Sequence, residues 1–307
     1  MLGYATRRIL QAIPTLLLIV AAAFFLMRAA PGGPFDDERA LPPEIEANLQ
    51  AAYGLDAPVH VQFGRYLAGL AQGDLGPSFR MKDFTVAELI GRGLPVTLSI
   101  GAAALLLGIG LGVPLGLVAG LRQNGWADHA VMSVALVGIA VPNFVVAPVL
   151  ALVFGLYLGW LPVAGWEPGS AKHLVLPVVT LALPLVAYLA RLTRGSLLEV
   201  LQAPFIRTAR AKGLDPGVIL RRHALKPTLL PVVSFLGPAA AALLTGSLVV
   251  EQVFGLPGVG RYFVQGAINR DYTLVMGMVI FYASLILLLN LLVDLAYGWL
   301  DPRIRQE

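Results

Sequence analysis

Three residue types that often carry chemistry are absent or rare in this chain. Cysteine is missing from the 307 residues, which excludes disulfides, thiolate metal sites and cysteine nucleophiles. None of the four lysines follows a glycine, so the Gly-Lys pair of a Walker A loop for ATP is missing. The four histidines, at positions 60, 129, 173 and 223, lack the spacing of metal ligands. The sequence therefore predicts no cofactor, no metal and no catalytic residue in this chain.

Charged residues are also scarce, and the gaps between them are informative. They make up 13% of the chain, against 57% hydrophobic residues. Six windows without Asp, Glu, Lys or Arg are long enough to cross a bilayer at about 1.5 Å per residue: 9–27, 93–121, 129–166, 173–190, 227–250 and 272–293. They predict an all-α integral membrane protein with six transmembrane helices. The predicted parts are a first span in 1–30, an external segment 31–93, a core 94–298 that includes a charged loop 193–227, and a tail 299–307.

The distribution of Lys and Arg predicts the orientation of these spans. Thirteen of them lie near span ends on one side, namely Arg7, Arg8, Arg122, Arg191, Arg194, Arg207, Arg210, Lys212, Arg221, Arg222, Lys226, Arg303 and Arg305. The residues counted on the other side are Lys172, Arg261 and Arg270. The segment 28–92 is left out of the count, because the bias of Lys and Arg toward the cytoplasm holds only for shorter loops. Both termini and the charged loop are therefore expected in the cytoplasm. This bias also explains the net charge of +4, so no nucleic-acid partner is expected.

A cleaved secretory signal peptide is the alternative interpretation of residues 1–30. The apolar run is long for the hydrophobic region of a signal peptide, and Arg28 stands where the cleavage site would be. A retained first span is therefore expected.

The external segment contains signals for two short helices. Pro43 fits the first position of a helix and Gly54 its C-terminal end, which predicts a helix over 43–53. A second helix is predicted from apolar residues at helical spacing: Val59, Phe63, Tyr66, Leu67 and Leu70. The apolar face of this helix is expected to rest on the outer ends of the chain's own spans. A docking surface for another protein is the alternative.

The spans themselves contain glycines, prolines and polar residues in patterns that suggest different roles. Gly108, Gly112, Gly116 and Gly120 form a ridge that predicts close helix packing. Proline pairs at 142 and 148, 177 and 184, and 231 and 238 are expected to kink three spans, for packing or to open a pathway. The candidate pathway-lining residues in these spans are Asn143, Thr180, Ser234, Thr245 and Ser247. Arg191, Glu251 and Asp294 lie near span ends, where capping or ion pairing is favoured over a proton relay.

The charged loop has unusually clear helix boundaries. Pro204 begins a predicted helix that runs to about Lys212, and Gly213 supplies the left-handed residue after it. Asp215 caps a second helix, which is predicted to end near Leu225, before Pro227. On the first helix, Phe205 and Ala209 are one turn apart beside the cations Arg207 and Arg210. Such an element suits docking to a protein, while simple attraction to anionic lipid is the alternative.

This loop resembles the EAA loop of peptide-type ABC importer permeases in the stretch from Phe205 to Leu214 and in Arg222-His223-Ala224-Leu225. In that family, its first helix is the coupling helix that docks on a separate ATPase subunit. Counted back from Gly213, the three named motif positions fall on Arg207, Thr208 and Ala209, so the glutamate of the general motif is absent. The resemblance implies an ATPase-coupling loop formed by Phe205, Arg207, Thr208, Ala209, Arg210, Lys212 and Gly213.

The resemblance extends along nearly the whole chain. It includes Arg7-Arg8-Ile9-Leu10, Gly73-Asp74-Leu75-Gly76, Pro142-Asn143-Phe144 and the stretch from Glu251 to Gly260. Gly76-Pro77-Ser78-Phe79 and Leu41-Pro42-Pro43-Glu44 resemble most the B subunit of oligopeptide permeases. This implies the type I ABC importer fold and a permease subunit in the inner membrane of a bacterium.

The implied partners are a homologous permease subunit, two ATPase subunits that bind ATP and Mg, a periplasmic or lipid-anchored peptide-binding protein, an oligopeptide and the lipid bilayer. Dipeptides, glutathione or nickel chelates are alternative cargoes. An ion-coupled secondary transporter is the alternative from another class, but its titratable residue in mid-membrane is missing from these windows.

Overall fold

The structure is a computed structural model that describes residues 2–29, 33, 43–81 and 83–300. Within these ranges the elements are helices, with one isolated antiparallel bridge between Pro77 and Thr85. The helices before the bend in the third predicted span are α1 (Leu2–Ala29), α2 (Pro43–Ala52), α3 (Val59–Ala71), α4 (Val86–Leu121) and α5 (Trp126–Ala140). The later ones are α6 (Asn143–Leu150), η1 (Ala151–Tyr157), α7 (Lys172–Gln202), α8 (Pro204–Ala211), α9 (Pro216–Val218), η2 (Ile219–Ala224), α10 (Leu225–Val253), α11 (Val259–Ile268) and α12 (Tyr272–Leu300).

Five helices are long and apolar enough to cross a membrane: 6–29, α4, α7, the continuous stretch 216–253 and the 272–293 part of α12. The sixth predicted span forms a bent pair, in which α5 and α6–η1 meet at 103°. The break at Pro142 agrees with the kink predicted in the window 129–166, although at this angle it divides the window into two helices. Pro142 disfavours the helical conformation of Val141, which is extended at φ −88° and ψ 119°.

The glycine ridge of α4 lies against α7, as predicted from its spacing. A Cβ at Gly116 would lie 2.4 Å from the carbonyl oxygen of Ala190, and one at Gly112 would lie 2.8 Å from that of Val186. Only glycine allows the two backbones to approach this closely.

The prolines of α7 and α10 lie inside continuous helices. The predicted helix end before Pro227 is also wrong, because one helix runs from Pro216 to Val253. Just before Pro227 the helix widens into the π-helical turn η2, where the N–H of Leu225 donates to the carbonyl of Leu220, five residues back. A wider turn of this kind accommodates the missing N–H and the ring of a proline.

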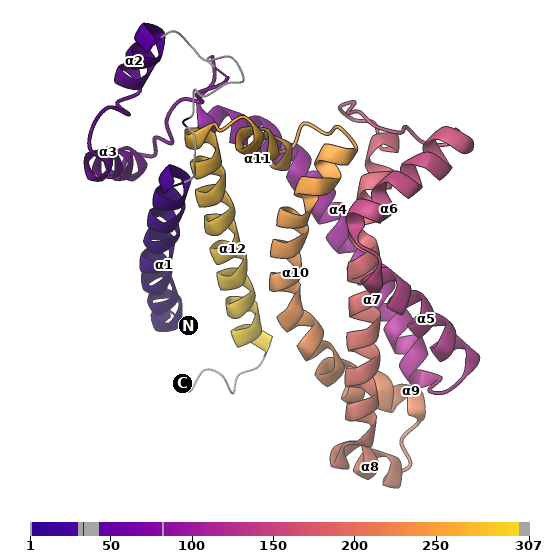
Figure 1. Ribbon diagram of the computed structural model, residues 1–307. Coiled ribbons are helices and arrows are strands. Elements are labelled where there is room, and N and C mark those ends of the chain that lie inside the picture. Colours follow the sequence, from indigo (N-terminus) through magenta and orange to yellow (C-terminus); the bar gives the residue numbers. More distant parts are fainter. Residues whose placement is uncertain (1, 30–32, 34–42, 82, 301–307) are drawn as a thin grey trace.

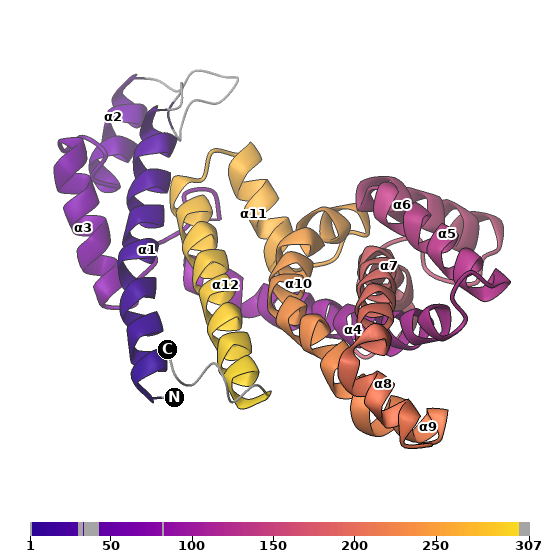
Figure 2. The same cartoon turned by 90° about the horizontal axis from the view of Figure 1, so that it is seen from below.

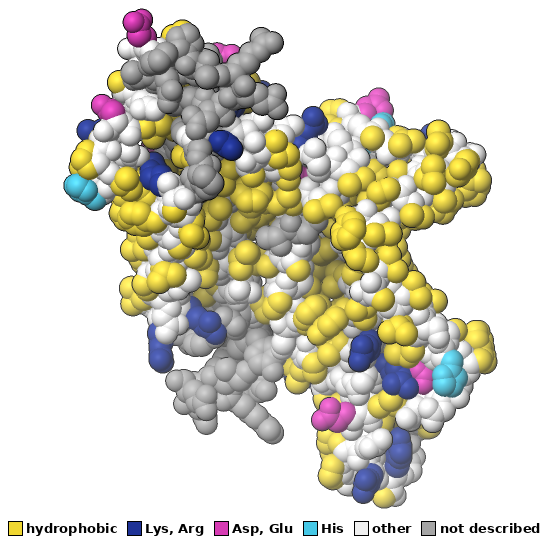
Figure 3. All heavy atoms as spheres, in the orientation of Figure 1, with side chains coloured by type: hydrophobic (Ala, Val, Ile, Leu, Met, Phe, Trp, Pro, Cys, Tyr) yellow, Lys and Arg dark blue, Asp and Glu magenta, His cyan; other side chains and the backbone are white. Residues whose placement is uncertain are grey.

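The two ends of the molecule differ clearly. In Figures 1 and 2, α2 and α3 lie beside the outer part of α1, whereas α8 and α9 project at the opposite end. The first residues of α1 and the end of α12 also point toward the α8 end (Figure 1). In Figure 3, hydrophobic side chains cover the middle of the visible face, while Lys and Arg gather near its two ends. This is the pattern expected of a chain that crosses a bilayer.

The helix α3 rests on the chain's own spans, which confirms the favoured interpretation of its apolar face. Its residues Phe63, Tyr66, Leu67 and Leu70 pack on a cluster formed by Val20, Phe24, Met276 and Ile280 of α1 and α12. At the end of α1, the Arg28 Nε donates to the Gln62 Oε1 at 2.9 Å. Gln62 in turn donates to the carbonyls of Leu55 and Ala57, so the turn between α2 and α3 is tied to the first span.

Candidate coupling site and outer-end contacts

The helix α8 has the boundaries that the sequence predicts. Ala203 is extended before Pro204, which occupies the first helical position. Gly213 follows with a φ of +73°, a left-handed conformation that favours glycine. The Asp215 Oδ2 then accepts a hydrogen bond from the N–H of Gly217 at 2.8 Å and caps α9.

One side of α8 is anchored in the protein. Ile206 is fully buried and Ala209 nearly so, and both belong to one apolar cluster with Leu197, Ile219 and Ala224. Leu117 of α4 and Val200, Leu201 and Leu220 complete this coupling cluster. Because the cluster joins α8 to the ends of α4, α7 and η2, a displacement of α8 acts on all three elements.

The opposite side of α8 is free to meet a partner. Phe205 is 48% exposed, and Arg207, Thr208, Arg210 and Lys212 are exposed as well. The expected pairing of Phe205 with Ala209 on one docking face is corrected, because Ala209 points into the coupling cluster. The exposed face combines an aromatic side chain with guanidinium donors, and such a surface can bind an apolar cleft that carries carboxylates or carbonyls.

The predicted pathway residues have different environments. Thr180 and Ser247 are fully buried, and their hydroxyls donate to backbone carbonyls of their own helices. Ser234 is half-buried and donates to the Leu230 carbonyl. Asn143 borders a hollow, whereas the side chain of Thr245 lies outside the described residues. The pathway assignment of the set stays a prediction.

The hollow beside Asn143 has a volume of about 250 Å³ and lies between the α5–α6 bend, α7 and α10. Tyr188 and Phe235 line it, with stacked rings whose centroids are 4.1 Å apart. This aromatic pair was not predicted from the sequence, because its members lie on two helices far apart in the chain.

Glu251 caps the beginning of α11, in agreement with the predicted role in capping or ion pairing. It is fully buried, and its Oε1 accepts a hydrogen bond from the Thr97 hydroxyl at 2.7 Å. Its Oε2 accepts from the N–H of Arg261 at 3.3 Å, while the N–H of Val259 donates to Thr97. A Cβ at Gly258 would lie 2.2 Å from Glu251 Oε2, so glycine lets the loop fold over the carboxylate. Arg191 is exposed, and the Asp294 side chain lies outside the described residues.

A second buried carboxylate, Asp271, joins the external segment to α12. The Ser78 hydroxyl and the N–H of Arg80 donate to its Oδ2, and the N–H of Leu274 donates to its Oδ1. The Thr273 hydroxyl donates to the Pro77 carbonyl at 2.6 Å. Asp271 was not among the predicted site residues, although an aspartate just before an apolar run is a typical helix cap.

Comparisons with known proteins agree with the resemblance found in the loop. The sequence profile of the family "Binding-protein-dependent transport system inner membrane component" matches residues 112–306, and the profile of its N-terminal part matches residues 1–101. The chain is 51% identical over 305 residues to the oligopeptide transport system permease protein OppB of Salmonella typhimurium and 50% identical to that of Escherichia coli, with 99% of this chain and 100% of each relative covered. It is 42% identical over 305 residues to the dipeptide transport system permease protein DppB of Bacillus subtilis, with 99% and 98% covered.

Solved structures share the fold at lower identity. A chain of the MetNI methionine ABC transporter in inward facing conformations superposes with a TM-score of 0.57 at 20% identity, over 70% of this chain and 97% of that chain. A crystal structure of an amino acid ABC transporter with histidines gives a TM-score of 0.51 at 20% identity, over 71% and 94%.

Proposed function

The chain belongs to the family of binding-protein-dependent transport system inner membrane components, and from this we propose that it is the permease subunit of an ATP-driven importer of oligopeptides. It has the all-helical fold of ABC importer membrane subunits that its sequence predicts. Oligopeptides are the proposed cargo because the identity to two OppB proteins, 51% and 50%, exceeds the 42% to a dipeptide permease over the same alignment length.

The observation that carries this proposal is the two-sided construction of α8. Ile206 and Ala209 fix the helix to the ends of the spans, while Phe205, Arg207 and Arg210 face outward. In the proposal, α8 inserts into a cleft of an ATPase subunit, and the coupling cluster passes the movement of that subunit to α4, α7 and η2. ATP and Mg²⁺ are bound by two ATPase subunits, since the chain has no Gly-Lys pair.

The proposed transport cycle needs three further partners. A homologous permease subunit pairs with this chain and encloses the path, and Asn143 with the neighbouring aromatic pair contributes to its wall. A soluble binding protein delivers the peptide at the end that carries α2 and α3. ATP binding and hydrolysis then shift the assembly between outward-facing and inward-facing states. In this orientation both termini and α8 are cytoplasmic and the segment 31–93 is external.

Reconstitution of the complete transporter in vesicles tests the proposal. Labelled oligopeptides should accumulate only when ATP, both permease subunits, the ATPase subunits and the binding protein are present. Stronger competition by dipeptides, glutathione or nickel chelates than by oligopeptides would favour those cargoes. Uptake driven by an ion gradient without ATPase subunits would contradict the proposed mechanism.

A further inference from the structure

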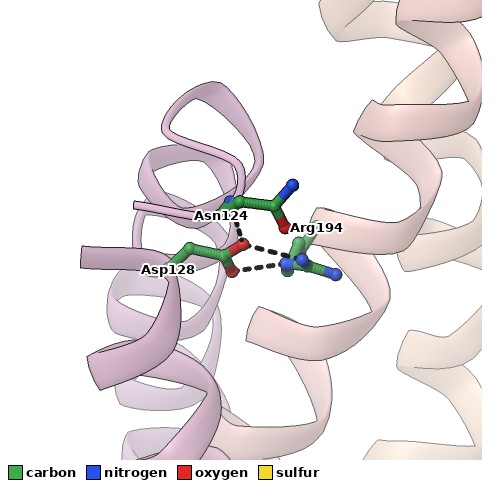
Figure 4. Close-up of polar contacts among 3 residues, drawn as sticks. All are labelled: Asn124, Asp128 and Arg194. Carbon is green, nitrogen blue, oxygen red and sulfur yellow. Dashed lines mark hydrogen bonds and ion pairs between the residues drawn. The ribbon is translucent and has the colours of Figure 1, made fainter. Parts of the chain in front are cut away.

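An ion pair whose carboxylate is buried joins α5 to α7 (Figure 4). The Arg194 Nε and Nη2 donate to the two carboxylate oxygens of Asp128 at 2.5 and 2.7 Å. The Asp128 side chain is 2% exposed and that of Arg194 26%. The N–H of Asn124, which has a left-handed φ of +61°, donates to the Asp128 Oδ2 at 2.9 Å. The carboxylate is therefore held in one orientation from two sides.

The apolar contacts around α5 are incomplete. A hollow of about 230 Å³ lies between α5, α4 and α7, bordered by Leu115, Ala130, Val134, Gly138, Leu183 and Val186. Small and branched side chains beside a hollow oppose sliding of one helix along another only weakly, since each missing contact removes dispersion energy. A bidentate pair between a guanidinium and a carboxylate fixes both distance and direction. The ion pair thus adds a directional contact to the apolar packing of α5 on α7.

The pair lies between the coupling cluster and the bend in the third span. Leu197, a member of the coupling cluster, is one helical turn beyond Arg194 on α7. Asp128 lies in the first turn of α5, and the other end of α5 meets α6 at the 103° bend. A displacement that enters α7 through α8 can therefore reach the bend through Asp128 and Arg194.

We propose that Asp128 and Arg194 form a latch that makes α5 move with α7, so that displacement of α8 also moves the bent pair α5–α6. Both are assigned as positioning residues, because their side chains bind each other and the N–H of Asn124. The inference rests on the proposed function for its transport readout.

Removing the charge on one partner of the latch tests this role in the complete, reconstituted transporter. For Asp128→Asn and Arg194→Gln, we expect ATP hydrolysis within about twofold of the unmodified rate, but peptide transported per ATP reduced at least about fivefold. Arg122→Gln is the matched control, because Arg122 is an exposed cation in the neighbouring α4–α5 turn. It should leave both quantities unchanged. Equal losses of hydrolysis and transport in the latch variants would indicate a purely structural role and overturn the proposal.

A disulfide can replace the latch, since the chain has no cysteine of its own. A Cβ at Gly138 would lie 3.0 Å from the Cβ of Ala187, so Gly138→Cys with Ala187→Cys places two thiols within reach after a small separation of the helices. In the Asp128→Asn background, oxidation should restore the transport-to-ATP ratio and reduction should abolish it again. If oxidation blocks transport in the chain with Asp128 intact, α5 slides on α7 during transport and the latch is refuted.

The extent of disulfide formation is a readout that does not depend on transport. In the purified chain, the cysteine pair at 138 and 187 should oxidise more completely with Asp128 than with Asn at 128. Equal oxidation would overturn the latch even if the chain transports peptides. Absence of ATP-driven uptake by the unmodified chain, with unequal oxidation, would instead contradict the proposed function alone.

Discussion

Gly213 illustrates how one residue fixes the geometry of the coupling loop. Its φ is +73°, and no atom lies within 4 Å of the position that a Cβ would occupy. A substitution there acts through backbone strain, at about 1 to 3 kcal/mol, and not through collision. Gly213→Val should therefore distort the turn between α8 and α9 and lower peptide uptake relative to ATP hydrolysis, while membrane insertion persists.

Gly195→Val is the matched control, because Gly195 in α7 also has open space at its Cβ position but lacks a left-handed φ. The control should transport normally. If Gly213→Val also supports normal uptake, the proposed role of this turn is wrong.

The cations on the outer face of α8 lead to a second prediction. Arg207→Glu with Arg210→Glu should weaken association with the ATPase subunits, because two outward-facing donors become acceptors of opposite charge. Co-purification at moderate salt measures this, with Arg122→Glu as the control on an exposed cation outside α8. Unchanged co-purification would favour the alternative in which α8 attaches to anionic lipid.

A third prediction concerns the buried carboxylate of Glu251. Glu251→Ala leaves the Thr97 hydroxyl and the N–H of Arg261 without their buried acceptor, which should destabilise the fold by about 3 kcal/mol. Thermal unfolding in detergent measures the loss, and Gln252→Ala, at the neighbouring exposed position, should have little effect. Equal unfolding temperatures for the two variants would argue against the cap.

The sequence predicts single residues well where their role is local. Gly213 and Asp215 have the predicted roles because turn and cap geometry depend on a few neighbouring residues. Asp128 and Arg194 are 66 positions apart, and charge spacing gave no reason to pair them. Ala209 lies on the same side of α8 as Ile206, and both side chains are in the coupling cluster. Which side of α8 is buried depends on the packing of α4, α7 and η2, which the local sequence does not give.

Among the elements, the pair α4–α7 depends most on close backbone approach. Gly116→Val should force the helices apart, because its Cβ would overlap the Ala190 carbonyl, and overpacking of this kind costs about 1 to 3 kcal/mol. Gly110→Val is the control on the same helix, since the Cβ position of Gly110 is open. A difference in unfolding temperature between the two variants is expected. The same temperature for both would show that the contact tolerates a larger residue.

The sequence predicts most elements correctly, and the errors have physical causes. The external helices α2 and α3 are found within one or two residues of their predicted ends. α4 begins at Val86, earlier than the uncharged window, because Thr85 and Glu88 form a capping box that was overlooked. The helix through Pro227 was missed because a π-helical turn is not encoded in apolar spacing.

At the scale of the whole molecule, the absence of cysteine allows the predicted orientation to be measured. Lys212→Cys and Asp56→Cys each place one thiol at an exposed position, at opposite ends of the spans. A membrane-impermeant maleimide should label position 56 from outside and position 212 only after the cytoplasmic side is opened. Labelling of both positions from the same side would contradict the topology.

The fold shared with solved transporters does not extend over the whole chain. About 70% of this chain covers 97% of the MetNI chain, so the shared fold leaves part of this chain outside it. Among the packing contacts of α1, those with α3 and α12 form a cluster of their own, separate from the one between α4, α7 and α10. The distribution of Lys and Arg predicts an orientation for the spans. It does not predict that α4, α7 and α10 share one apolar cluster.

The continuous helix from Pro216 to Val253 connects the region of α8 with the region of α11. Its 38 residues measure about 57 Å along the axis at 1.5 Å per residue. One end adjoins α8 and the other carries Glu251 under the beginning of α11. A tilt of about 5° at the α8 end would carry the far end through about 5 Å, nearly the pitch of one helical turn. To the extent that the π-helical turn and the internal prolines keep their geometry, a continuous helix thus converts a slight rotation beside α8 into a larger displacement beside α11.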